Sequence, residues 1–66
     1  MNSQLASYAR KKIKEGLSEL TVKHQMFFKR LYSHKNRDLS IDTIVDKMPE
    51  EKLNQALNQV QNSLKI

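Results

Sequence analysis

Glycine and proline each occur once in this 66-residue sequence, whereas residues that favour helices are abundant. Because β-hairpin turns depend on glycine, little of the chain is suited to them, and the sequence predicts an all-α fold. A chain of this length forms one domain at most, here residues 1–66, and buries only about 60% of its unfolded surface. With no cysteine for a disulfide, stability has to come from helix packing or self-association.

The spacing of apolar residues predicts four helices, at about residues 3–19, 21–33, 41–48 and 49–64. Gly16 lies in the apolar stripe of the first helix, and Leu20 stays in phase beyond it. We therefore expect one continuous helix in which Gly16 lets a neighbouring helix approach closely, with a break at Gly16 as the alternative. Thr21 and Ser40 are suited to N-cap the second and third helices, and Pro49 to open the fourth.

The second helix has apolar residues on three sides instead of one stripe: Val22 and Met26, Phe27 and Leu31, Phe28 and Tyr32. A helix that is apolar on several sides is normally covered by its neighbours. We therefore predict a four-helix mini-bundle packed around a central second helix. Its aromatic rings, together with Tyr8, either fill the core or leave an exposed aromatic patch.

The positive charge is concentrated in the first part of the chain. The net charge is +5. Residues 1–37 hold nine basic and two acidic side chains, which gives +7, and residues 38–66 hold three basic and five acidic ones, which gives −2. This asymmetry is compatible with an anionic partner on the first half.

No arrangement of residues indicates catalysis. Asp42 and Asp46 lie one turn apart, but on the side of their helix away from its apolar stripe. Ser33, His34 and Asp38 are close in sequence without an elbow or oxyanion hole beside them. The two histidines have no metal-binding spacing, and a domain this thin is expected to lack a pocket of about 300 Å³. We predict no enzymatic activity, metal, cofactor or small-molecule substrate.

The chain has no apolar run approaching the roughly 20 residues that span a bilayer, and its N-terminal residues lack the apolar centre of a signal peptide. We therefore expect a cytoplasmic protein without membrane contact.

Two surfaces remain as binding candidates, and the central position of the second helix decides which cations and rings face outward. The leading hypothesis is a protein-interaction module whose contact strip combines basic and aromatic residues: Lys23, Phe27, Arg30 and His34. The first alternative is a nucleic-acid-binding protein that uses six cations: Arg10, Lys14, Lys23, Arg30, Lys35 and Arg37. The second alternative is a structural homo-oligomer subunit, and a homodimer is compatible with the leading hypothesis as well.

Two segments, Leu20–Ser33 and Asp46–Leu53, resemble small uncharacterised helical proteins that bacteriophages and prophages encode. The resemblance covers about half of the chain and contains no chemical motif. It implies a small accessory protein that modulates a host or phage protein in a bacterial cytoplasm. The resemblance assigns a function to no individual residue of this chain.

Overall fold

The computed structural model describes residues 3–33 and 38–65, and all regular secondary structure in these ranges is helical. The helices are α1 (Ser3–Glu19), α2 (Val22–Tyr32), α3 (Ile41–Lys47) and α4 (Glu50–Leu64). The predicted all-α fold is confirmed, and each helix ends within about one residue of its predicted bounds. No helix in the described part of the chain is long and apolar enough to cross a membrane.

The helices begin where the sequence supplies caps. The hydroxyl oxygen of Thr21 accepts a hydrogen bond from the backbone N–H of His24 at 3.3 Å, and that of Ser40 accepts one from Thr43 at 3.2 Å. Each contact satisfies a backbone donor that the first turn of a helix leaves free. Pro49 occupies the N-cap position of α4, one residue earlier than its predicted place in the first turn.

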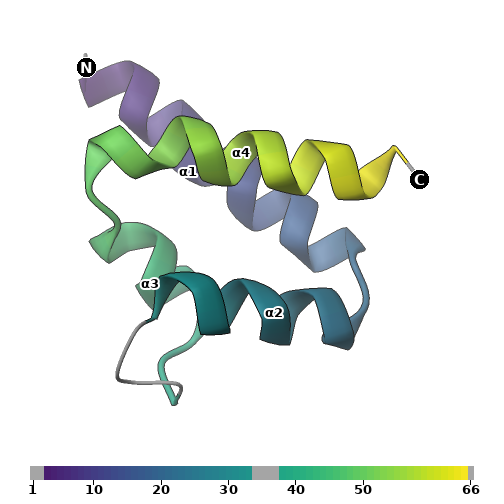
Figure 1. Cartoon of the computed structure of the whole chain (residues 1–66). Coiled ribbons are helices and arrows are strands. Elements are labelled where there is room, and N and C mark those ends of the chain that lie inside the picture. The colour runs from purple at the N-terminus through teal and green to yellow at the C-terminus, as the bar shows by residue number, and fades with distance from the viewer. Residues whose placement is uncertain (1–2, 34–37, 66) are drawn as a thin grey trace.

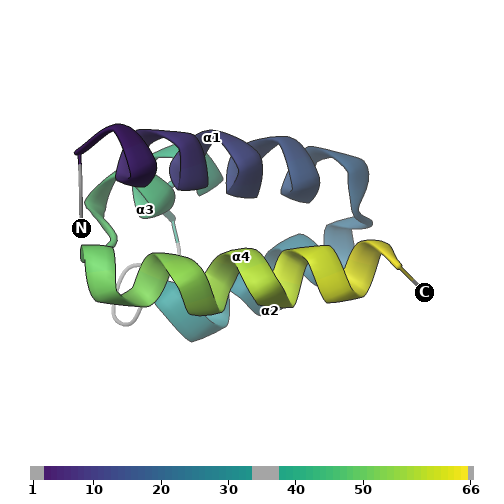
Figure 2. The same ribbon diagram turned by 90° about the horizontal axis from the view of Figure 1, so that it is seen from above.

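The helices form two layers (Figures 1 and 2). One layer contains α1 and α3, and the other contains α4 and α2. Helices α1 and α4 run in the same direction and pack against each other along their length, whereas α2 runs the opposite way. The buried side chains come mainly from α1, α3 with its C-cap, and α4: Ala6, Ala9, Ile13, Leu17, Ile44, Val45, Met48, Leu53, Ala56 and Val60.

The position of α2 differs from the predicted central one. Within α2, all of whose residues are described, only Phe28 is buried. The Cα atoms span 31 × 29 × 15 Å, and 15 Å is the thickness of two helices packed about 8–10 Å apart. A molecule this thin surrounds no helix on all sides. Helix α2 therefore lies at one edge, and two of its three apolar sides are left uncovered.

Gly16 explains why α1 and α4 form the centre instead. Helix α1 is continuous through Gly16, and a Cβ atom added there would overlap the Cγ1 methyl of Val60 and lie 3.3 Å from Cδ1 of Leu64. The expectation that Gly16 allows close helix approach is confirmed. Three alanines on the two helices, Ala6, Ala9 and Ala56, are buried in the same core and add little bulk to it.

We predict that Gly16→Ala lowers the free energy of unfolding by about 1–2 kcal/mol, because the overlap with Val60 outweighs the gain in helix propensity of roughly 1 kcal/mol. Urea unfolding followed by circular dichroism measures the change. In a Val60→Ala background the same substitution should cost less or become stabilising, because the opposing methyl groups are gone. An equal cost in both backgrounds would contradict the close contact.

Candidate functional site

Helix α2 carries an exposed surface of mixed apolar and basic character, which we call the α2 surface. It consists of six exposed side chains: Val22, Lys23, Met26, Phe27, Arg30 and Leu31. The four apolar members expose 69% (Val22), 62% (Met26), 57% (Phe27) and 41% (Leu31) of their side chains. Large apolar side chains grouped in this way commonly mark a contact site.

Three residues of the predicted protein-binding strip, Lys23, Phe27 and Arg30, belong to the α2 surface. The fourth, His34, lies outside the described residues, as do Lys35 and Arg37. The strip was derived from a central second helix, which the structure does not have. Its three described members are exposed because α2 lies at the edge of the fold.

The four aromatic residues divide between core and surface. Phe28 is buried, and Tyr32 is half-buried with its ring centroid 4.6 Å from that of Phe28. Phe27 and Tyr8 are each 57% exposed, and the ammonium of Lys12 lies 5.6 Å from the centroid of the Tyr8 ring. Neither alternative holds for all four rings: Phe28 and Tyr32 pack in or against the core, whereas Phe27 on α2 and Tyr8 on α1 are exposed.

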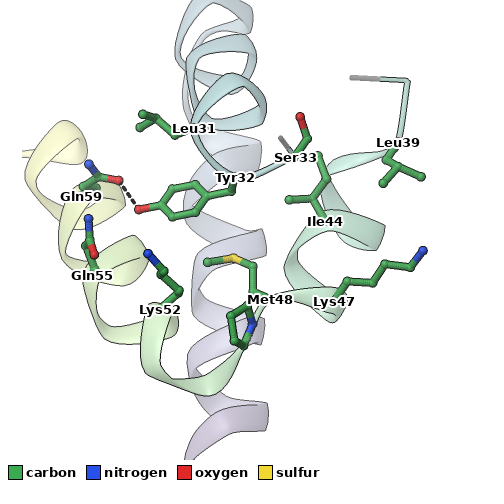
Figure 3. A pocket seen from close by; sticks show the side chains of 11 residues that line it. Leu31, Tyr32, Ser33, Leu39, Ile44, Lys47, Met48, Lys52, Gln55 and Gln59 are labelled. Carbon is green, nitrogen blue, oxygen red and sulfur yellow. Dashed lines mark hydrogen bonds between the residues drawn. The ribbon is translucent and has the colours of Figure 1, made fainter. Parts of the chain in front are cut away.

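A groove runs between α2 and α4, and we call it the α2–α4 groove. It consists of two hollows of about 350 and 210 Å³ that adjoin at Leu31 and Gln59. The floor comes from the other layer: Ile44 and Met48 beneath the larger hollow (Figure 3), and Leu17 beneath the smaller one. The expectation that the domain lacks a hollow of about 300 Å³ was therefore wrong, because α2 and α4 stand apart where the thin core does not fill the space between them.

Tyr32 crosses the groove (Figure 3) and donates a hydrogen bond from its hydroxyl to Oε1 of Gln59 at 2.6 Å. Burial raises the pKa of Tyr32 above its ordinary value of 10.0, because the charged phenolate loses hydration there. The contact joins α2 to α4 at Gln59, which lines both hollows, whereas Tyr32 lines only the larger one.

The four described members of the predicted nucleic-acid-binding set are divided between α1 and α2. Arg10 donates from Nε to the carbonyl of Val45 at 3.3 Å and from Nη2 to that of Met48 at 2.9 Å. The ammonium of Lys14 lies 2.7 Å from a carboxylate oxygen of Asp46. Both side chains thus face the C-terminal end of α3, whereas Lys23 and Arg30 lie on α2.

Sequence reasoning missed the structural role of Arg10. Its guanidinium donates to two carbonyls at the C-terminal end of α3, of which that of Val45 also accepts from the backbone N–H of Met48. It thereby places positive charge at the negative end of that helix. Gln25 acts similarly on α1, because its amide donates to the carbonyls of Leu17 at 2.8 Å and Leu20 at 3.3 Å. Neither role has a sequence signal, since each depends on which helix end lies beside the side chain.

The groove walls show no catalytic arrangement. Ser33 lines the larger hollow, and its buried hydroxyl has no hydrogen-bond partner among the described residues. The described residues that line this hollow include no histidine or carboxylate to activate it, and His24 lines only the smaller hollow. Among the described residues, no three histidine, aspartate or glutamate side chains come together as a metal site. Asp42 and Asp46 are exposed, as expected.

Comparison with known proteins identifies no relative. No protein family model, no curated protein and no solved structure matches this chain significantly.

Tyr32→Phe should lower the free energy of unfolding by about 0.5–1.5 kcal/mol at neutral pH, because it removes the bond to Gln59. A raised pKa in the folded state means that the contribution of Tyr32 is complete below pH 10 and is lost as the pH rises through its folded pKa. The stability difference between wild type and variant should therefore shrink above pH 10 in urea titrations. Tyr8→Phe is the matched control, with an expected change within about 0.5 kcal/mol.

Arg10→Ala should destabilise the fold by about 1–2 kcal/mol in urea unfolding, because two charge-assisted hydrogen bonds to α3 are lost. Arg10→Lys keeps the positive charge but lacks the planar group that donates to two carbonyls at once. It should therefore restore only part of the lost stability. Lys11→Ala, on the exposed neighbour, should change stability by no more than about 0.5 kcal/mol. Equal effects of Arg10→Ala and Lys11→Ala would contradict the assignment.

Proposed function

We propose that this chain is a non-enzymatic protein-binding module whose contact site is the α2 surface. One observation carries the proposal: a helix of the fold leaves Val22, Met26, Phe27 and Leu31 largely uncovered. Burying such side chains in a partner is favourable by about 25 cal/mol for each Å² of apolar area. Phenylalanine, methionine and arginine side by side are also typical of the centre of protein interfaces.

A protein partner is favoured over a nucleic-acid partner because of the residues that surround the cations. Salt-sensitive binding to a phosphate backbone requires several cations on one surface. The α2 surface offers Lys23 and Arg30 between apolar side chains, while Arg10 and Lys14 are engaged with α3. The hollow that Arg10 and Lys14 line also contains the acidic residues Glu15 and Asp46.

A partner of different sequence is favoured over a second copy of this chain. Helix α2 contains Lys23, Lys29 and Arg30 and no acidic residue. A two-fold dimer through the α2 surface would place the same patch of each copy against the other. Like charges brought together in this way oppose association. Homodimerisation through α2 is thus the weaker alternative.

The resemblance to phage- and prophage-encoded proteins makes a bacterial cytoplasmic protein the proposed class of partner. Modulation of a host or phage protein by direct contact requires only a small rigid domain with one helix that binds the partner. The α2 surface on the α1–α4 scaffold meets that requirement.

Affinity capture from a bacterial lysate, with and without nuclease, tests the proposal. Arg30→Glu and Phe27→Ala should each abolish capture of a specific protein without changing the helical circular dichroism spectrum, because both residues are exposed. Lys11→Glu makes the same charge change on an exposed position of α1 and should leave capture intact.

Two outcomes would contradict the proposal. Capture that disappears on nuclease treatment would indicate nucleic-acid binding. Capture that survives both Arg30→Glu and Phe27→Ala would exclude the α2 surface as the contact site.

A further inference from the structure

We infer that the α2–α4 groove binds an amphipathic helix of the partner, with apolar residues on one face and acidic residues beside them. The inference rests on the proposed function, because Phe27 and Leu31 belong both to the α2 surface and to the groove. It specifies that the partner contacts the groove with a helix, and it specifies the chemistry of that helix.

The groove is apolar where an inserted side chain would reach. Phe28 and Val60 are buried at the smaller hollow, and Ile44 and Met48 are buried at the larger one. Leu31 stands between the two hollows and is 41% exposed. Apolar side chains of a partner would make van der Waals contacts with these apolar residues that water does not make.

The charges beside the groove are of one sign. Lys47 on α3 and Lys52 on α4 line the larger hollow, and both are exposed. Among the described residues that line the two hollows, none is acidic. The other polar groups of the α4 wall are neutral, among them the amides of Gln55, Gln59 and Asn62. Charge complementarity therefore selects a partner segment rich in aspartate or glutamate.

A helix suits the groove better than an extended strand. Both walls are helices whose backbone groups are paired internally, so there is no sheet edge to which a strand could add. A bound helix satisfies its own backbone and presents only side chains. Helix α2 has 11 residues and is thus about 16 Å long, which matches about three turns of a partner helix.

The two hollows set the spacing of the anchoring residues. Along α4 the larger hollow is lined from Lys52 to Gln59 and the smaller one from Gln59 to Ser63. Their centres are therefore separated by roughly five or six residues, or about 7–9 Å along the helix. Anchors one to two turns apart, at i and i+4 or i+7, would enter the two hollows, which adjoin at Leu31 and Gln59.

The test is selection of binders from a displayed library of random peptides about 14 residues long against the purified full chain. We expect the enriched peptides to carry net negative charge and apolar residues at i, i+4 or i+7. Their binding should weaken tenfold or more in the double variant Lys47→Glu, Lys52→Glu, and less than twofold in Lys11→Glu. Amide shifts in NMR spectra should map the bound peptide to α2 and α4.

The possible outcomes distinguish peptide binding in the α2–α4 groove from binding at the α2 surface alone. Peptides that lose binding with Arg30→Glu but tolerate Lys47→Glu, Lys52→Glu would keep the α2 surface as the contact site and overturn the groove. Enrichment of basic or uncharged peptides, or of none, would also overturn it. So would sedimentation with phosphatidylserine-containing vesicles that depends on Lys47 and Lys52, because a flat lipid surface cannot reach the groove floor.

Discussion

The close contact of α1 with α4 is the constraint on which the rest of the structure depends. Gly16 admits the side chain of Val60, and the absence of a Cβ atom there lets the two helices approach closely. These two helices with α3 then enclose a core to which α2 adds one buried ring, Phe28, and the half-buried ring of Tyr32. The fold is therefore complete with most of the apolar surface of α2 still outside it.

The sequence predicts the helices well because the signals for them are local. Apolar spacing, the caps at Thr21 and Ser40, and the break at Pro49 act within a few residues of each helix end. The position of α2 in the fold could not be predicted from such local signals. Apolar residues on three sides of a helix are equally compatible with burial in the fold and with burial in a partner, and the local pattern does not distinguish them.

The candidate site was predictable only in part, for the same reason. Lys23, Phe27 and Arg30 share an exposed side of α2, as helical spacing suggests, although the premise of a central helix was wrong. The engagement of Arg10 and Lys14 with α3 depends on a contact across more than thirty positions of the chain. The α2–α4 groove is likewise built from α1, α2, α3 and α4 together, so no single stretch of sequence contains it.

The edge position of α2 has an evolutionary consequence. Because the outward side chains of this helix contribute little to the core, natural selection can replace them without compromising folding, provided that Phe28 and the contact of Tyr32 with Gln59 remain. Substitutions can therefore accumulate in one helix while the other three retain an inherited scaffold. A lineage of such proteins would vary most along α2 and least around Gly16 and Val60.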